Sequence, residues 1–191
     1  MRVVLALVSV LVTLLSVPSP AGASDLPVTD QAVFLLRVLA YDRNLKMRTP
    51  EAVTILLAYQ AGNDPSEAAK NELTGEINRL AKDRRVADLS IRVTPIAYTS
   101  LDDLDASLGR TKASALFVCP GLDSSVAIIS TVTRRRSVLT FTGVESWARR
   151  SLAIGLVARE EKPTVVINLS ASKAEGADLD PALLRIAEVI R

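Results

Sequence analysis

Apolar and polar positions along the chain follow two patterns, continuous apolar runs and amphipathic stripes. Runs typical of strands covered on both faces occupy residues 52–59, 113–119 and 138–142. The stretches between them have apolar residues at helical spacing, and residues 64–84 form the clearest stripe. Strands that alternate with helices predict a parallel sheet with right-handed crossovers.

Two segments depart from this alternation. Residues 89–98 alternate apolar and polar positions and contain Pro95, which is typical of an edge strand. Residues 152–158 and 164–169 are apolar arms on either side of a charged turn, which predicts an antiparallel hairpin. The predicted fold class is therefore α/β: a single three-layer domain with a mostly parallel sheet, an antiparallel C-terminal hairpin and helices on both faces.

The helices at the two ends of this domain have distinct signals. Residues 30–41 are apolar nearly all round, so this helix is either buried or meets a partner. Asp180 and Pro181 predict the start of a last helix whose apolar side reaches Ile190. Near the middle of the chain, residues 123–125 are predicted to cap the helix that follows them.

The first 23 residues are typical of a signal peptide. A basic start precedes an apolar run over residues 3–17, and Pro18 and Pro20 then lead to small residues that fit a cleavage site at 21–23. We expect residues 1–23 to be removed, which leaves a periplasmic domain over 24–191 without a membrane span. An uncleaved anchor helix is the alternative, which the short apolar run disfavours.

Composition excludes several classes of function. Lys and Arg total 23 and Asp and Glu 21, so no strong field attracts nucleic acid or an anionic membrane. Aromatic residues make up 4% of the chain, too few for base-stacking platforms, and we expect no nucleic-acid partner. The chain has no His, which excludes His-based acid–base catalysis and His metal ligands. Neither a dinucleotide fingerprint nor a P-loop is present, and we expect no cofactor.

The carboxyl edge of the predicted sheet is the candidate ligand edge. In an open parallel sheet, ligands bind beyond the carboxyl ends of the strands. The residues at that edge are Gly121, Ser124, Ser125, Thr142 and Gly143. Ser124 and Ser125 open a helix whose backbone N–H groups could hold an anion. The alternative for each of these loops is ordinary turn chemistry.

Two further features each leave two interpretations open. Cys119 ends an apolar run, so it is either a redox-active thiol or a small buried hydrophobic residue, and disulfide pairing between two copies in a homodimer stays open. Trp147 beside Arg149 and Arg150 is either a packing residue or part of an aromatic and Arg patch that binds a partner.

The second half of the chain resembles a known family. The segments ALFVCPGLDSSVAIISTVTRRRSVLTFTG and AIGLVAREEKPTVVINLSASKAEGADLDPALLRIAEVIR are similar to YfiR/HmsC-type periplasmic proteins. The resemblance covers about residues 30–191 in the order of elements. The residues that align best are Val138, Leu139, Thr140, Ile167, Asn168 and Leu169.

This resemblance implies an exported α/β protein with a regulatory role. The best-known type in the family is a periplasmic repressor that binds the periplasmic sensor region of an inner-membrane diguanylate cyclase, and disulfides tune its repression. This chain departs from that type because one Cys cannot form an intrachain disulfide. It also has residues 149–151, Arg-Arg-Ser, where many members have glycines, and residues 41–47 replace an aromatic segment of the family.

Two functions from different classes follow. The first is a non-enzymatic periplasmic regulator that binds and represses the periplasmic region of an inner-membrane signalling protein, a diguanylate cyclase acting in c-di-GMP signalling or a sensor kinase. Its contact residues would be Trp147, Arg149, Arg150 and Phe34 of the first helix. The alternative is a periplasmic small-molecule binding module related to solute-binding proteins.

Overall fold

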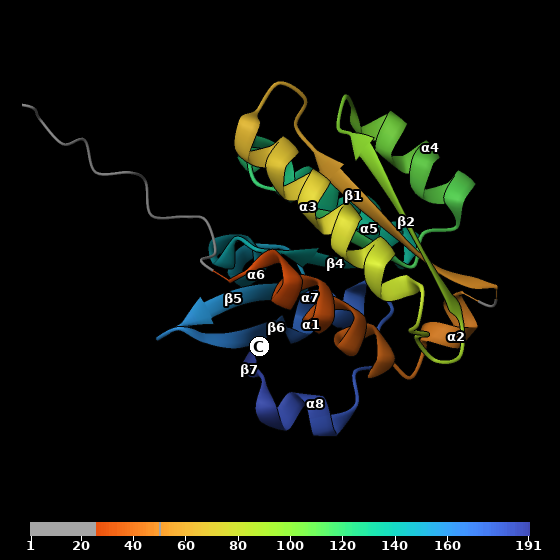
Figure 1. Cartoon of the computed structure of the whole chain (residues 1–191), viewed down its shortest axis with the longest axis vertical. Coiled ribbons are helices and arrows are strands. Elements are labelled where there is room, and N and C mark those ends of the chain that lie inside the picture. The colour runs from red at the N-terminus through yellow and green to blue at the C-terminus, as the bar shows by residue number, and fades with distance from the viewer. Residues whose placement is uncertain (1–25, 50) are drawn as a thin grey trace, which may run out of the picture.

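Strands and helices alternate along most of the chain (Figure 1). The computed structural model describes residues 26–49 and 51–191, so the expected signal peptide over 1–23 lies outside the described residues. The strands are β1 Ala52–Tyr59, β2 Ser90–Ala97, β3 Ala115–Val118, β4 Leu139–Thr142, β5 Ile154–Arg159, β6 Lys162–Asn168 and β7 Glu188–Ile190. The helices are α1 Val28–Ala40, α2 Leu45–Arg48, α3 Asp64–Ala81, α4 Leu101–Thr111, α5 Val126–Arg136, α6 Glu145–Arg150, α7 Leu169–Ala174 and α8 Pro181–Ile186.

The strands of the described residues form one sheet in the order β2-β1-β3-β4-β5-β6-β7. Neighbours from β2 to β5 pair in parallel, β5 and β6 form an antiparallel hairpin, and β7 pairs in parallel with β6. The strand predicted to lie at an edge, β2, is the first strand of this order. The predicted mostly parallel sheet with an antiparallel C-terminal hairpin is confirmed.

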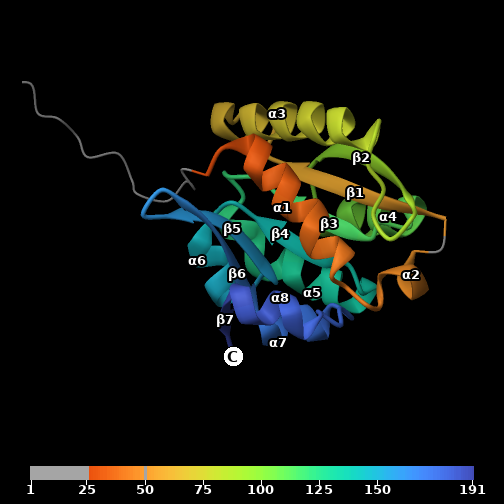
Figure 2. The same ribbon diagram turned by 60° about the horizontal axis from the view of Figure 1, so that its bottom comes forward.

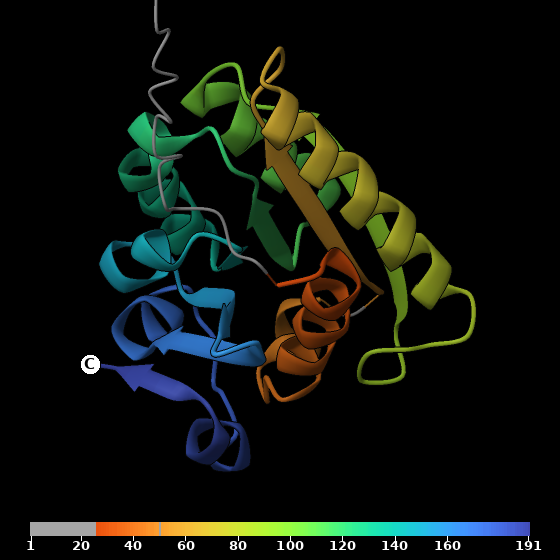
Figure 3. The same cartoon turned by 60° about the vertical axis from the view of Figure 1, so that its left-hand side comes forward.

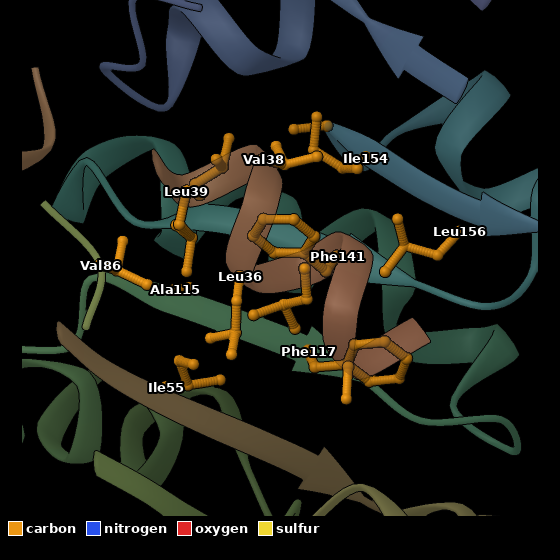
Figure 4. Packing of buried hydrophobic residues seen from close by; sticks show 14 of the residues in the cluster. Leu36, Val38, Leu39, Ile55, Val86, Ala115, Phe117, Phe141, Ile154 and Leu156 are labelled. Atoms are coloured by element: carbon orange, nitrogen blue, oxygen red, sulfur yellow. The ribbon is translucent and has the colours of Figure 1, made fainter. Parts of the chain in front are cut away.

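Helices cover both faces of the sheet, which confirms the predicted three layers (Figures 1 and 2). Because successive strand residues point to opposite faces, Ile55 and Leu57 of β1 join one apolar cluster while Leu56 joins the other. The first cluster packs beneath α1 and α3, with Phe117 and Phe141 at its centre (Figure 4). The second cluster packs beneath α4, α5 and α6 and contains Trp147.

The C-terminal segment differs from the prediction. The last helix, α8, ends at Ile186, and residues 188–190 form β7 at the outer edge of the sheet (Figure 3). Residues 188–190 pair with Val166, Ile167 and Asn168 of β6. This pairing stabilises the segment as a strand more than its weak helical preference stabilises a helix. Of residues 123–125, predicted to cap the next helix, Ser125 does occupy the N-cap position of α5, but the three residues form a 3₁₀ turn and Ser125 makes no side-chain capping hydrogen bond.

No helix within residues 26–49 and 51–191 is both long enough and apolar enough to cross a bilayer.

Candidate functional site

The first helix has two apolar faces, and only one of them lies on the sheet. Leu35 and Leu39 are fully buried against the sheet. On another side of the helix, Phe34, Arg37 and Tyr41 follow at spacings of three and four residues and stay partly exposed. The Arg37 guanidinium lies 5.6 Å from the centre of the Phe34 ring. The sequence pattern predicted a helix apolar nearly all round, and these two faces account for it.

This second face forms one wall of a groove, which we call the α1–α8 groove. Its volume is about 380 Å³, and segments far apart in the sequence surround it (Figure 2). The groove is lined by Phe34, Arg37, Val38 and Tyr41 of the first helix and its end, Pro163 and Val165 of β6, and Leu183, Ile186 and Ala187 at α8. Two of these apolar side chains are open to solvent, Ile186 at 80% and Tyr41 at 41%. Phe34, a contact residue proposed from sequence, therefore lies in a solvent-accessible apolar groove.

The capping of α8 explains why Ile186 is presented in this way. The Asp180 carboxylate accepts a hydrogen bond from the Ala182 N–H at 2.7 Å, and Pro181 occupies the first turn. Leu183 is buried under this short helix, whereas Ile186 at its last position faces solvent. An isoleucine exposed to this extent contributes almost nothing to the core, so its apolar surface is available to a partner.

The patch around Trp147 differs from the surface contact expected of it. Trp147 is 1% exposed, and its indole N–H donates to the Asp123 carboxylate at 3.1 Å. The packing interpretation is therefore correct, and the placement of Trp147 on a contact surface is wrong. Six-residue helix α6 lies near the surface, but its Trp points into the core beneath it.

Arg149 is occupied by ion pairs, whereas Arg150 is free to make contacts. Arg149 and Arg159 each pair with both Glu145 and Glu188, which closes a ring of four charges. Hydrogen bonds to Glu145 and then to Glu188 raise the pKa of Arg149 above its ordinary value. Arg150 is exposed and donates to the Ser146 carbonyl in its own helix at 3.1 Å.

The candidate ligand edge is partly closed by packing. Thr142 is fully buried, and its hydroxyl accepts from the Val144 N–H at 3.1 Å. Gly121 is exposed with φ at +91°, and a Cβ atom there would lie 2.9 Å from the Asn63 side chain, so the turn requires glycine. Ser124 is exposed and Ser125 half-buried in the 3₁₀ turn.

Gly143 is the member of this edge that borders a cavity, which we call the strand-end cavity. It measures about 220 Å³ and lies where β3 and β4 end. Phe117, Pro120 and Gly143 line it from the sheet. The start of α1 and the first turns of α3 line its other sides. The sheet edge named from sequence therefore borders a mainly apolar, partly open cavity rather than an array of polar groups.

Cys119 lies in the core. Its side chain is fully buried, and burial raises the pKa of the thiol to about 12. A protonated, inaccessible thiol is not a nucleophile at neutral pH. The structure therefore favours the interpretation of Cys119 as a small buried hydrophobic residue.

Two buried polar groups were not recognised from sequence. The Glu175 carboxylate is fully buried and accepts hydrogen bonds from the Thr140 N–H at 2.8 Å and from the hydroxyls of Thr133 and Thr140. Burial raises its pKa to about 7, against the opposing effect of these hydrogen bonds. Asp42 forms an ion pair with Arg48, and its other carboxylate oxygen accepts the backbone N–H of Asp178 at 2.9 Å. No local pattern distinguishes these residues from solvated charges, because Thr133, Thr140 and Asp178, which help to hold them, lie far away in the chain.

A family model described as YfiR/HmsC-like matches residues 47–188 of the chain. This range contains β1 to β6, all the helices from α3 to α8 and most of the residues of the groove. No curated protein matches the chain.

Several solved structures share the fold at low sequence identity. A conserved domain protein from Vibrio cholerae aligns with a TM-score of 0.61 and 12% identity, over 88% of this chain and 60% of that one. The ABC domain from Streptococcus pneumonia in complex with L-Trp aligns with a TM-score of 0.56 and 15% identity, over 80% of this chain and 62% of that one. The substrate binding protein CD0873 from Clostridium difficile aligns with a TM-score of 0.56 and 14% identity, over 78% of this chain and 57% of that one. The chain thus spans about three fifths of the length of these proteins, and the likeness concerns the fold alone.

Proposed function

Because the chain belongs to the YfiR/HmsC-like family, we propose that it is a non-enzymatic periplasmic regulator. It binds the periplasmic region of an inner-membrane signalling protein, a diguanylate cyclase or a sensor kinase, and represses its output. This role requires export, which the signal peptide expected over residues 1–23 would provide.

The α1–α8 groove is the observation that carries this proposal. Soluble proteins rarely leave side chains such as Ile186, which is 80% exposed, beside an apolar groove unless a partner covers them. Buried apolar surface at the centre of an interface supplies most of the binding free energy. Helix α1, whose residue Phe34 was proposed as a contact from sequence alone, supplies one wall of this groove.

The charge of the groove defines the kind of segment that fits it. Arg37 is the only charged side chain among the described residues that line the groove. Its partner in the structure is the Phe34 ring, and no ion pair with a carboxylate is formed within the described residues. The complementary segment is therefore an apolar stretch, such as one face of an amphipathic helix, with an Asp or Glu placed to meet Arg37.

Arg150 provides a second, separate contact in this proposal. It is exposed and its guanidinium has one hydrogen bond, to a carbonyl of the same helix. Replacement of Arg150 by Glu would reverse the charge without disturbing a buried neighbour. We expect a smaller effect on binding than from the groove, because charges at the rim of an interface mainly change association rates.

The experiment compares two exposed apolar residues, Ile186 in the groove and Met47 outside it. Ile186→Asp places a charge in the groove, whereas Met47→Asp changes an equally exposed apolar residue on α2, 81% exposed, outside the groove. Tagged wild-type protein and both variants are used to isolate partners from detergent-solubilised membranes, and the captured proteins are identified by mass spectrometry. Capture of a membrane protein with a periplasmic region and a cyclase or kinase domain by wild type and Met47→Asp, but not by Ile186→Asp, supports the proposal. Equal capture by all three proteins would remove the groove from it.

A second candidate function is small-molecule binding. It is favoured by the fold shared with the L-Trp-bound ABC domain and the substrate binding protein CD0873. A thermal-shift screen against metabolites tests this candidate, because a ligand present at a hundred times its Kd stabilises a protein by about 2.7 kcal/mol.

A further inference from the structure

The strand-end cavity has mainly apolar walls, and Gln31 and Glu72 are the polar side chains among the described residues that line it. Phe117 at the end of β3 is 1% exposed, and Figure 4 places its ring beside the arrowhead of that strand. Leu26 and Val28 at the start of α1 face the same space. On α3, Ala68 and Ala69 contribute only methyl groups where a longer side chain would fill the cavity. The cavity is thus a consequence of two adjacent alanines on the helix that covers the strand ends.

The size of the cavity matches one aromatic ring with a short substituent. An engineered apolar cavity of about 150 Å³ binds benzene. The strand-end cavity is larger, about 220 Å³, and it is lined mainly by Leu, Val, Ala, Pro and Phe side chains. Cavities of this composition bind apolar ligands because water gains few hydrogen bonds inside them.

One charged group at the cavity determines which ligands it accepts. Glu72 on α3 is the only charged side chain among the described residues that line the cavity. Glu72 is itself exposed to solvent. A ligand amine would be attracted to this carboxylate, whereas a ligand carboxylate would be repelled by it, and no Lys or Arg is among the described residues that line the cavity.

From this geometry we propose that the strand-end cavity is a binding site for a small single-ring aromatic compound that carries an amine. The ring lies against Phe117 between α1 and α3, and the amine reaches Glu72 at the opening. The inference rests on the second candidate function and gives it a site and a ligand class. It is independent of the α1–α8 groove, although α1 lines both: its first residues border the cavity, and Phe34 to Tyr41 border the groove.

The test uses two probes of similar size and opposite charge, benzylamine and benzoate. The mature protein, labelled with ¹³C at Leu and Val methyl groups, is titrated with each probe and followed by NMR. Benzylamine is expected to shift the methyl signals of Leu26, Val28 and Leu73 in a saturable way, and benzoate is expected to bind at least about tenfold more weakly.

Three variants locate the binding site. Ala69→Leu fills the cavity and is expected to abolish benzylamine binding, while Ala106→Leu makes the same change at an exposed position of α4 and is expected to have no effect. Glu72→Gln leaves the cavity intact and is expected to remove the preference for benzylamine over benzoate. Because Glu72 is exposed, this variant stays informative even if Ala69→Leu does not fold.

Either of two results overturns the inference: no saturable shifts with benzylamine, or binding unchanged in both Ala69→Leu and Glu72→Gln. If benzylamine fails but another metabolite stabilises the protein in the thermal-shift screen, the second candidate function survives and only this site is wrong. The titration uses the isolated protein, so its result does not depend on the regulatory partner.

Discussion

Trp147, Cys119 and Glu175 are each 1% exposed or less, and burial determines what each side chain does. Trp147 uses its single N–H to bind the Asp123 carboxylate, which satisfies the indole and removes it from any interface. Cys119 is surrounded by apolar side chains that keep its thiol protonated. Glu175 holds the end of α7 against Thr133 of α5 and Thr140 of β4 through its hydrogen bonds. These three roles depend on neighbours that are distant in sequence, so residue type alone did not identify them.

Glu175 makes the free energy of unfolding dependent on pH. Burial raises the pKa of its carboxyl from 4.5 to about 7 in the folded protein, so the folded state binds its proton more tightly than the unfolded state does. The stability that this proton provides is fully present below about pH 4.5 and is lost as the pH rises to about 7, by roughly 3 kcal/mol. Urea unfolding of wild type at pH 5 and pH 8 measures this loss.

The matched variant for this measurement is Glu175→Gln, which cannot ionise. Its amide can still accept from the Thr140 N–H and donate to the hydroxyls of Thr133 and Thr140. We expect the variant to lose less stability than wild type between pH 5 and pH 8. Arg134 is the charged group that also acts on this carboxyl, and it is unchanged in the comparison. Parallel pH profiles for the two proteins would contradict the role assigned to Glu175.

The Cys119 thiol is expected to be unreactive in the folded protein. It is fully buried and its pKa is raised to about 12, so neither access nor ionisation favours attack on a disulfide reagent at pH 8. Reaction with Ellman's reagent should be negligible in buffer and complete in guanidinium chloride. Rapid labelling of the native protein, or a covalent dimer under non-reducing conditions, would restore a redox role for Cys119.

At the scale of elements, the short strand β7 depends on side-chain contacts as much as on its ladder. It has three residues at the sheet edge and pairs with β6 alone. Glu188 links it to Arg149 of α6 and Arg159 of β5. Such partly exposed ion pairs add little individually, about 0–1 kcal/mol each, but these four charges form a closed network. Periodicity predicted a helix here because a three-residue strand is too short to show an alternating pattern.

Glu188→Gln is expected to loosen β7 without unfolding the domain. Hydrogen exchange of the segment 183–191 should become faster than in wild type, while exchange of β1 and β3 stays unchanged. In wild type, 1 M salt should have a similar effect on this segment because it screens exposed charges. The control is Glu76→Gln, which removes an ion pair with Arg79 on α3, a helix that packs against β1 and β2 at the opposite end of the sheet from β7. Unchanged exchange of the segment 183–191 in Glu188→Gln would show that the ladder alone holds the strand.

At the scale of the whole molecule, the three layers were predictable and the groove was not. The apolar runs over residues 52–59, 113–119 and 138–142 each became an inner strand, because a run without polar positions fits only where helices cover both faces. The same reasoning placed the candidate ligand edge at the strand ends, where Gly143 borders a cavity. The α1–α8 groove joins residues 34–41, 163–165 and 183–187, and no local pattern reports that these segments meet.

The proposed binding of the partner's periplasmic region to the α1–α8 groove is best tested by measuring affinity across variants of the groove. The purified periplasmic region of the captured partner is titrated against wild type, Ile186→Asp, Met47→Asp, Arg37→Glu and Arg37→Lys. We predict that Met47→Asp binds like wild type, that Ile186→Asp and Arg37→Glu raise Kd by at least about tenfold, or about 1.4 kcal/mol, and that Arg37→Lys retains most of the affinity. Wild-type affinity in both Ile186→Asp and Arg37→Glu, with both variants folded, would contradict the claim.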